Sequence, residues 1–407
     1  MHDRFSQQVN EWRGDIVRFA RDLIRTPSLS GSEGAIAEFM VQRMRELGYD
    51  EVLIDPAGNV VGVIRGEGEA SVVLNNHMDS VDPGERSNWQ HDPYGGEEVD
   101  GFLHGRGASD VKGSIAAQIY AGALIKKLGI PLKGNLVVTG VVQEEEAECI
   151  GIQYLCDETL PEMGLKPQLF VLGEATGLNL YLGHRGRLEM EVTTIGRTSH
   201  ASAPWLGSNA VYKMLPVIAA IQELSTTLPS HPFLGKSTVT VTNVTARPGK
   251  HSIIPDRCTA SLDRRYLPSE TLDMILGQIQ SVLNRLQTQD PEFKGEVKVR
   301  FSKETTYRGF SKDAPKHMAP FLTNEDDRFV KSALGALEGI GETPQFDKWY
   351  FNTDGSYTSG VLGIPTLGFG PGEEKYSHTP FDRVSIDSML RAAAGSAAIA
   401  EAILGGK

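Results

Sequence analysis

The sequence predicts an α/β protein of two domains, in which a mostly parallel sheet covered on both faces is interrupted by an inserted ferredoxin-like α+β domain. Three observations support this fold class. The chain has 407 residues, which is about two to three times the usual size of one domain. Its first part alternates continuous apolar runs with helical stretches, as buried parallel strands do. From about residue 184 the runs alternate apolar with polar residues, which indicates strands with one wet face.

The larger domain is predicted over residues 1–183 and 304–407. Residues 5–26 and 34–48 place apolar side chains at helical spacing, and residues 112–128 are predicted to form a further helix. Four apolar runs do not alternate cleanly with polar residues, so they fit strands that are buried on both faces. These runs are "SVVLNNH", "GNLVVTGVVQEEE", "KPQLFVLGEAT" and "GIPTLGFGPG".

The smaller domain is predicted over residues 184–303. Helical stretches near 208–226 and 270–288 lie between the alternating runs and give the order β-α-β-β-α-β, which is typical of a ferredoxin-like fold. The runs are "HRGRLEMEVTTIG", "STVTVTNVTAR", "DRCTASLDRRYL" and "VKVRFS". After residue 323 a helix and an apolar strand at 363–370 resume the first pattern, which indicates that the smaller domain is inserted into the larger one.

Composition excludes several classes of function. Hydrophobic residues make up 40% and charged residues 23% of the chain, as in ordinary globular proteins. The formal net charge of −12 disfavours binding to nucleic acid or to anionic membranes. The first residues lack the pattern of a signal peptide, and no window reaches the ~18 apolar residues of a spanning helix, so we expect a cytoplasmic protein. Cys149, Cys156 and Cys258 are too few and too scattered for a disulfide framework.

Charged residues follow four of the predicted buried strands. They are His77 and Asp79 after "VVLNN", Glu144, Glu145 and Glu146 after "LVVTGVVQ", Glu174 after "LFVLG", and His378 after "PTLGFG". Ligands of an open α/β sheet bind beyond the carboxyl ends of its strands, so we expect these side chains to converge there. Asp110 in "GRGASDVKG" is added to them, since glycines leave room for the backbone before a predicted helix.

Such a cluster of carboxylates and imidazoles needs a cation. Its members would otherwise repel one another or have strongly shifted pKa values. A pair of divalent metal ions meets this need, because zinc binds imidazole nitrogen and carboxylate oxygen in open catalytic sites. The histidines lie too far apart for a local HExxH helix, so the sequence predicts a site assembled from strand ends.

Five ordered motifs resemble a known enzyme family. The motifs are "HMD", "GRGASDVKG", "QEEE", "GEATG" and "SHTPFDRV", and they extend across nearly the whole chain. They resemble the co-catalytic zinc hydrolases that include aminoacylase, acetylornithine deacetylase, succinyl-diaminopimelate desuccinylase, carboxypeptidase G and various dipeptidases. Within this family, "VQEE", "GHRGR" and "DKW" with "FGPG" after it are most similar to the selenium-metabolism-linked hydrolase branch.

The resemblance implies a role for each strand-end residue. His77 and Glu174 would hold one zinc ion, Glu145 and His378 the other, and Asp110 would bridge both. Asp79 would accept the other ring N–H of His77 and so fix its tautomer. Glu144 would be the general base that takes a proton from the attacking water and passes it to the leaving nitrogen. The implied cofactors are two Zn2+ per chain, with Co2+ or Mn2+ able to substitute.

One departure from the family pattern leaves two registers open. The family usually has Asp-Glu-Glu, whereas this chain has Gln143 followed by three glutamates. If Gln143 stands where the family has Asp, the base is Glu144 and the ligand is Glu145. If Glu144 stands there, the base is Glu145 and the ligand is Glu146. The first register is favoured, because it also places Gly151 where relatives have a glycine.

The inserted domain resembles the part through which relatives dimerise, so a homodimer is expected. His200 in "TSHASAPWLGSNAV" matches the histidine that, in relatives, reaches the partner's active site and stabilises the oxyanion. Ser252 stands where many relatives have asparagine, which puts that substrate contact in question. Arg264, Arg265 and the backbone of "GFGPG", including Gly370, are candidates for binding a substrate carboxylate.

The predicted function is metal-dependent hydrolysis of an amide bond in a small peptide or an N-acyl amino acid. The alternative is a non-enzymatic protein that binds or senses peptides on the same scaffold. A degenerate member of that kind should have lost at least one ligand, whereas this chain keeps the whole set. The motifs do not separate a deacylase from a dipeptidase, because specificity depends on loops such as 303–323.

Overall fold

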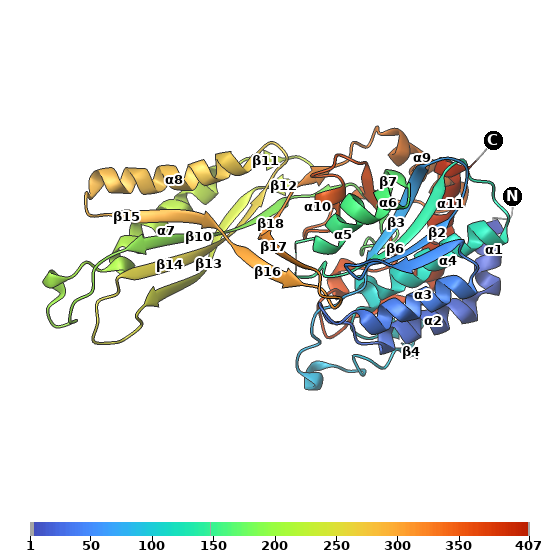
Figure 1. The fold of residues 1–407 in the computed structure, drawn as a ribbon, viewed down its shortest axis with the longest axis horizontal. Coiled ribbons are helices and arrows are strands. Elements are labelled where there is room, and N and C mark those ends of the chain that lie inside the picture. The colour runs from blue at the N-terminus through green and yellow to red at the C-terminus, as the bar shows by residue number, and fades with distance from the viewer. Residues whose placement is uncertain (1–3, 147, 406–407) are drawn as a thin grey trace. The chain divides into compact units, whose positions relative to one another are not determined.

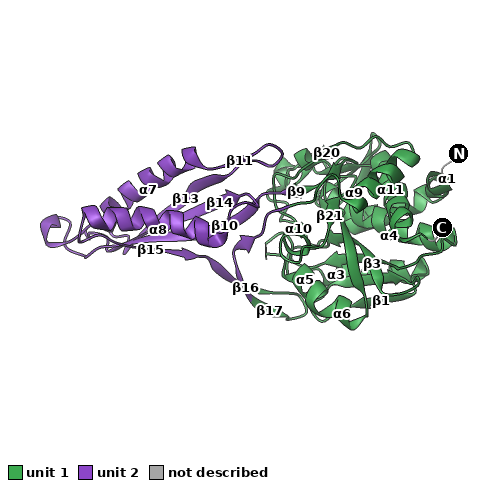
Figure 2. Ribbon diagram, turned by 90° about the horizontal axis from the view of Figure 1, so that it is seen from above, with its two compact units in different colours: residues 1–183, 303–312, 322–407 green, residues 184–302, 313–321 purple. Residues whose placement is uncertain are grey.

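The computed structural model describes residues 4–146 and 148–405, which form two compact units. Unit 1 comprises Met1–Gly183, Lys303–Lys312 and Leu322–Lys407, and unit 2 comprises His184–Ser302 and Asp313–Phe321 (Figure 2). The chain passes between the units near four short strands: β9 (Gly183–His184), β16 (Phe301–Thr305), β17 (Ser311–Pro315) and β19 (Phe321–Leu322).

Unit 1 contains an eight-stranded sheet with the order β1-β2-β6-β3-β7-β21-β8-β20. Figure 1 labels β2, β3, β6 and β7 of this sheet. The central strands β6, β3, β7 and β21 pair in parallel, whereas β1, β2 and β6 pair antiparallel at one edge. The strand bounds are β1 (Glu51–Ile54), β2 (Val60–Ile64), β3 (Ala70–His77), β6 (Asn135–Val141), β7 (Lys166–Leu172), β8 (Leu180–Tyr181), β20 (Phe346–Asp347) and β21 (Thr366–Gly368). Every residue of β6 is buried, so both faces of the sheet are covered there. The predicted α/β class is confirmed.

Helices cover the sheet of unit 1. Of these, α4 and α11 contact β3 and β6, and α10 contacts β7 and β21. The bounds are α1 (Arg4–Glu11), α2 (Arg13–Arg25), α3 (Gly34–Glu46), α4 (Gly113–Lys127), α5 (Ile150–Tyr154), α6 (Leu160–Glu162), α9 (Arg328–Gly339), α10 (Gly355–Thr358) and α11 (Ile386–Leu404). The single helix predicted at 5–26 is wrong in one respect, because the backbone of Trp12, with ψ near 1°, separates α1 from α2.

A small separate sheet of unit 1 joins two distant loops. Its order is β22-β5-β4, with β4 (Glu97–Val99), β5 (Phe102–His104) and β22 (Arg383–Ser385). Strands β5 and β22 run antiparallel, with Arg383 opposite His104. The segment that follows β5 therefore lies beside the segment that precedes β22.

Unit 2 has an antiparallel sheet with the order β13-β14-β10-β15, and β18 adds to β10. The strands are β10 (Gly186–Ile195), β13 (Thr238–Arg247), β14 (Arg257–Tyr266), β15 (Lys294–Val299) and β18 (His317–Met318), and β11 (Ser230–His231) pairs with β12 (Gly235–Lys236). Helices α7 (Ala210–Thr227) and α8 (Leu272–Gln289) pack on it around a core that includes Leu188, Val217 and Ile279. The chain order β10-α7-β13-β14-α8-β15 is the ferredoxin-like order. None of the helices in the described part of the chain is both long and apolar enough to span a membrane.

Candidate metal centre

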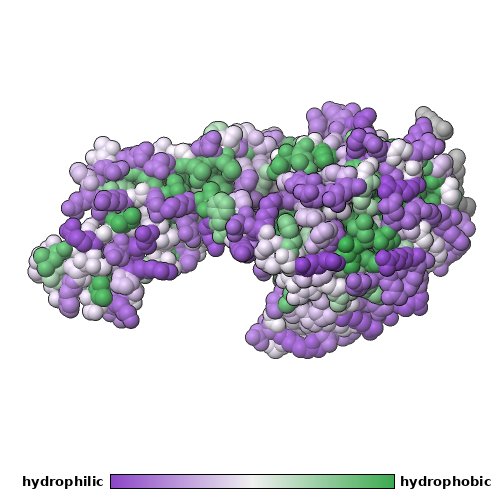
Figure 3. All heavy atoms as spheres, in the orientation of Figure 1, coloured by the Kyte–Doolittle hydropathy of each residue, from purple (hydrophilic) through white to green (hydrophobic). Residues whose placement is uncertain are grey.

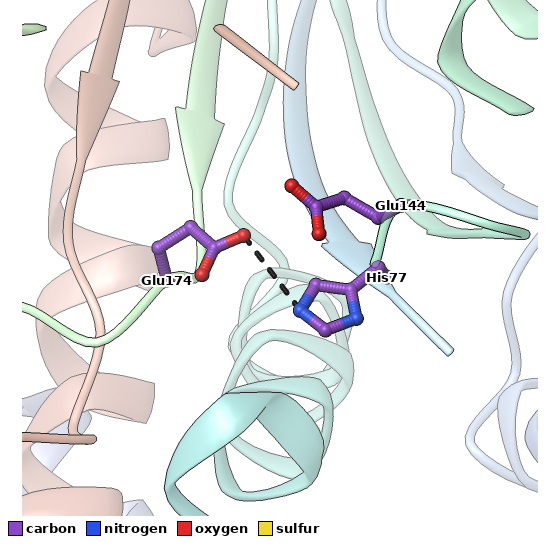
Figure 4. Close-up of side chains that lie close together, drawn as sticks. All are labelled: His77, Glu144 and Glu174. Atoms are coloured by element: carbon purple, nitrogen blue, oxygen red, sulfur yellow. Dashed lines mark ion pairs between the residues drawn. The ribbon is translucent and has the colours of Figure 1, made fainter. Parts of the chain in front are cut away.

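The strand-end side chains meet at the carboxyl end of the parallel strands of unit 1. His77 is the last residue of β3, Glu144 and Glu145 follow β6, and Glu174 follows β7. Parallel strands all point the same way, so residues that follow neighbouring strands reach the same edge of the sheet. Figure 4 shows His77, Glu144 and Glu174 with their side chains turned toward one another. Asp110 lies in the irregular turn before α4, where its φ of −131° and ψ of 85° are not helical.

The distances in this cluster single out Asp110. One carboxylate oxygen, Oδ1, lies 3.0 Å from His77 Nε2, and the other, Oδ2, lies 3.3 Å from His378 Nε2. His77 Nε2 is also 3.7 Å from Glu174 Oε1, while His378 Nε2 is 3.0 Å from Glu145 Oε2. Asp110 therefore faces both imidazoles at once, one through each oxygen.

Among the described residues, two sets of side chains offer ligand atoms that lie within 4.8 Å of one another. They are His77, Glu144 and Glu174, and His77, Asp110 and Glu145. The atoms are imidazole nitrogens and carboxylate oxygens, which zinc accepts in open catalytic sites. The donor set therefore fits a centre with divalent metal ions.

Asp79 organises the backbone of this centre. Its carboxylate accepts hydrogen bonds from the backbone N–H groups of Glu144 and Glu145, each at 3.1 Å, and from the Ser30 hydroxyl at 2.6 Å. Its own carbonyl oxygen lies 3.0 Å from His77 Nδ1, while its carboxylate lies 3.5 Å from the same nitrogen. Asp79 therefore fixes the turn that carries the two glutamates as well as the ring of His77.

The pKa values in the cluster are strongly shifted. Burial alone lowers the pKa of His77, but hydrogen bonds to Asp110 and Asp79 outweigh it and hold that pKa well above its usual value. Hydrogen bonds to Asp110 and Glu145 raise the pKa of His378 to about 10. Burial raises the pKa of Glu144 and of Glu174 well above the usual range. The carboxylates thus favour any positive charge placed among them.

Sequence comparison identifies the family. Residues 73–402 match the profile of Peptidase family M20/M25/M40. The chain belongs to this family. The M20 match spans the segments that bear His77, Asp110, Glu174 and His378, together with the whole of unit 2.

Two relatives align over nearly the whole chain. An uncharacterized protein of Escherichia coli (strain K12), YgeY, is 36% identical over 394 residues, covering 97% of this chain and 95% of its own. The N-formyl-4-amino-5-aminomethyl-2-methylpyrimidine deformylase of Bacillus subtilis (strain 168) is 27% identical and covers 94% and 93%.

Solved structures have the same fold. The aminopeptidase PepT from Bacillus cereus superposes with a TM-score of 0.75 at 20% identity, covering 96% of this chain and 98% of its own. The YXEP protein of Bacillus subtilis, described as a dinuclear metal binding peptidase of the M20 family, superposes with a TM-score of 0.72 at 15% identity, covering 97% and 99%. The M20 chain described here is therefore a metal-dependent amidohydrolase that acts on small substrates.

The geometry bears on the two registers of the glutamate run. Glu145 pairs with His378, and Glu144 lies with His77 and Glu174. Glu146 is exposed at the surface. Gln143 has a positive φ of 56°, and its side-chain amide donates to the carbonyl of Thr305 at 2.7 Å. The first register, with Glu144 as the base and Glu145 as the ligand, stays a prediction.

Sequence reasoning missed three buried carboxyl groups around the centre. Asp354 accepts a hydrogen bond from Asn75 Nδ2 at 2.7 Å, and burial raises its pKa to about 6. Glu33 accepts the backbone N–H groups of Gly31 and Gln143 at 3.0 and 3.2 Å. Asp382 binds the turn that precedes Asp110. All three lie in loops, where an acidic residue is common, and Asp382 was given no role although it stands inside the motif "SHTPFDRV".

The predicted substrate-binding groups are engaged in other contacts. Arg264 is only 1% exposed and forms an ion pair with buried Glu270. Arg265 pairs with Asp263 at 2.8 Å. The N–H of Gly370 donates to the Thr176 hydroxyl at 3.0 Å. These contacts weigh against a role for Arg264 and Gly370 in binding a substrate carboxylate.

His200 lies in unit 2 on the exposed segment before α7. Its Nδ1 lies 2.6 Å from the Ser202 hydroxyl and accepts the Ser202 N–H at 3.1 Å. The backbone of His200 forms an isolated bridge with Ile253. Within its own unit, the ring is therefore held by local contacts.

Proposed function

We propose that this M20 enzyme hydrolyses an amide bond in a small peptide or an N-acyl amino acid at a centre of two zinc ions. The observation that supports it most directly is the position of Asp110, whose two oxygens face His77 and His378 at 3.0 and 3.3 Å. A carboxylate shared in this way suits a bridging ligand between two metal ions.

Each ion would have its own ligands besides Asp110. His77 and Glu174 would hold one ion, and Glu145 and His378 would hold the other, in line with the 3.7 and 3.0 Å separations inside these pairs. When bound, such ions polarise the substrate carbonyl and favour ionisation of a water near neutral pH. The side chain of His378 is 52% exposed, which leaves an approach for substrate on its side.

Glu144 would move the proton. Its carboxylate offers an oxygen within 4.8 Å of ligand atoms of His77 and Glu174, so it lies within reach of a water held at the centre. In this role, Glu144 takes a proton from the attacking water and passes it to the leaving nitrogen. Asp79 holds the backbone of Glu144 and Glu145, so the base and its neighbouring ligand keep a fixed separation.

The sequence by itself also left open a non-enzymatic peptide-binding protein. It would need no base, and loss of any one ligand would not harm it. The chain keeps all five ligands and a glutamate beside them, and its relatives include a deformylase. These observations favour the enzyme.

We further propose that unit 2 mediates a homodimer. It exposes large apolar side chains on the 3-10 turn before α7 and on α7 itself: Trp205, Leu206, Tyr212 and Leu215. Hydrophobic residues also interrupt its hydrophilic surface on the face drawn in Figure 3. Strand β13 is an unpaired edge of the sheet, and such an edge favours pairing with another chain. In such a dimer, His200 would reach the active site of the partner and stabilise the oxyanion there.

Metal analysis tests the central proposal. After dialysis the protein should hold about two zinc-like ions per chain, and a strong chelator should abolish activity. An enzyme that stays active after complete removal of metal would contradict the proposal. A screen of N-acetyl amino acids against dipeptides, with added zinc or cobalt, would then define the substrate.

Mixing two inactive variants tests the role of His200. A Glu144→Gln chain and a His200→Ala chain should regain activity together, because one site of the mixed dimer would have both residues intact. The measurement is activity after subunit exchange, with each variant alone as the control. No recovery in dimers shown to exchange would count against a role in the partner's site.

A further inference from the structure

Two loops that bear predicted metal ligands run side by side in unit 1. One follows β5 and leads to Asp110, and the other contains His378 and leads into β22. Their contact continues the pairing of β5 with β22, since the N–H of Gly105 donates to the carbonyl of Asp382 at 3.0 Å. Asp110 and His378 therefore lie in two loops that the pairing of β5 with β22 holds together.

Asp382 supplies acceptors to the loop of Asp110. Its side chain is buried, with 1% of the residue exposed. Its Oδ2 accepts the N–H of Gly107 at 2.7 Å and Arg106 Nη1 at 3.1 Å, and its Oδ1 accepts the N–H of Ser109 at 2.9 Å. Gly107 has a φ of 81° and the following turn is irregular. A buried N–H without an acceptor is costly, so this carboxylate stabilises the turn.

Other bonds join the same two loops. Arg106 Nη1 also donates to the carbonyl of Thr379, the residue after His378, at 3.3 Å. The Ser109 hydroxyl accepts the N–H of Glu373 at 2.8 Å and donates to its carbonyl at 3.1 Å. Ser109, the residue before Asp110, is thus bonded to the loop of His378, and Thr379, the residue after His378, is bonded to the loop of Asp110.

We infer that Asp382 is a positioning residue that sets the separation of Asp110 from His378 and so the affinity of the ion these two would share with Glu145. The inference rests on the proposed two-metal centre. Asp382 touches neither a ligand atom nor the substrate in this role. It acts through the backbone of Gly107 and Ser109, which fixes where Asp110 begins, and through Arg106, which links it to Thr379 beside His378.

The carboxylate is required because both of its oxygens accept N–H groups. In Asp382→Asn one of the two oxygens becomes an NH2 group, which would face a donor in either orientation. At least one backbone N–H of the turn would lose its acceptor, and Asp110 would be held less firmly. Residues that orient metal ligands typically change metal affinity by roughly 10- to 100-fold when they are substituted.

The experiment is a zinc titration of the metal-free, full-length protein in competition with a chromophoric chelator, repeated with Co2+ and read by its visible absorption. Wild type should bind two ions. Asp382→Asn should bind both ions more weakly, because Asp110 would be a ligand of each, with the larger loss of roughly 10- to 100-fold at the ion shared with His378 and Glu145. Equal affinities in variant and wild type, or an equal loss at both sites, would overturn the inference.

Glu342→Gln is the matched control. Glu342 is buried and accepts two bonds from Arg391, at 2.8 and 2.6 Å. Removal of this ion pair should lower stability in urea without changing either zinc affinity. Selective loss of one ion in the control as well would overturn the inference, because it would then follow from lost stability alone.

Arg106→Lys covers the case in which Asp382→Asn does not fold. It leaves both backbone bonds of Asp382 in place but removes the guanidinium that bridges Asp382 and Thr379. A weaker effect on the same ion is expected, and unchanged binding of both ions would overturn the inference. If wild type itself binds fewer than two ions, the two-metal proposal fails instead, so the two failures are distinguishable.

Discussion

Each unit buries charged groups, but one cluster in unit 1 holds an excess of carboxylates. In unit 2, Arg264 pairs with Glu270, which also accepts the N–H of Leu267 at 3.0 Å and the Ser237 hydroxyl. In unit 1, four carboxylates surround two imidazoles: Asp110, Glu144, Glu145, Glu174, His77 and His378. A buried ion pair whose two charges cancel needs no further ion, whereas an excess of buried carboxylates needs an additional cation. This difference separates a structural cluster from a functional one.

The two sheets explain why the clusters differ. Parallel strands in unit 1 bring their carboxyl ends to one edge, so the residues that follow them converge. Strands of the unit 2 sheet run antiparallel, so the ends of neighbours lie at opposite edges. Charged residues there meet in pairs, as Arg265 and Asp263 do along β14.

The largest expected effect comes from Glu144→Gln. The substitution should lower kcat by about 10²- to 10⁴-fold, because it removes the proton acceptor. Both metal ions should remain bound. The measurement is kcat together with metal content.

Glu145→Gln is the control for that variant, since it should lose one ion as well as activity. If Glu144→Gln lost an ion while Glu145→Gln kept both, the assignment of base and ligand would be reversed.

Removal of Arg264 would test whether the charges of unit 2 are structural. Arg264→Met leaves Glu270 buried without its cation, which should cost about 3–5 kcal/mol of unfolding free energy. Metal content should not change. Urea denaturation gives the stability, and the double variant with Glu270→Met should recover much of the loss. A stable Arg264→Met enzyme with a raised KM would instead support the substrate role predicted from the sequence.

Glu33 is a buried carboxyl group of unit 1 that should make the stability of the protein depend on pH. Burial, followed by the nearby charge of Asp79, raises the pKa of Glu33 from 4.5 to about 7. Between about pH 4.5 and about pH 7 the folded state therefore binds one proton more than the unfolded state. The free energy of unfolding falls as pH rises through this range. Glu33→Gln should abolish this fall and gain up to about 3 kcal/mol above pH 7.

Denaturation of wild type and Glu33→Gln at pH 4, 6 and 8 would measure this effect. The two curves should separate only as pH rises. A constant difference across the whole range would show that Glu33 is not the group that titrates.

The smallest effect on stability is expected at the partly exposed pair of Arg265 and Asp263 in unit 2. Arg265 and Asp263 are each about a quarter exposed, and solvent screens such a pair. Arg265→Gln should change stability by about 0–1 kcal/mol. Urea denaturation would measure the change. If Arg265→Gln lost as much unfolding free energy as Arg264→Met, the buried pair would not be more important for stability than the exposed pair.

Much of the fold could be predicted because the sequence pattern reflects burial directly. The unbroken apolar runs before His77, Glu144 and Glu174 became β3, β6 and β7, and the alternating runs after residue 184 became the antiparallel sheet. The edge hairpin of β1 and β2 was not predicted, since its strands are only four and five residues long. Short runs of this kind do not distinguish a strand from a loop.

The sequence by itself determined the fold class, the family and the strand ends at which charged residues stand, because hydrophobic periodicity and local motifs lie along the chain. Only the tertiary structure decided what those residues contact. It joined Asp382 to the turn before Asp110 across more than 270 positions, and it paired Arg264 with Glu270. Such contacts depend on loops brought together by strand pairing, and a single acidic or basic residue in a loop does not reveal its partner in advance.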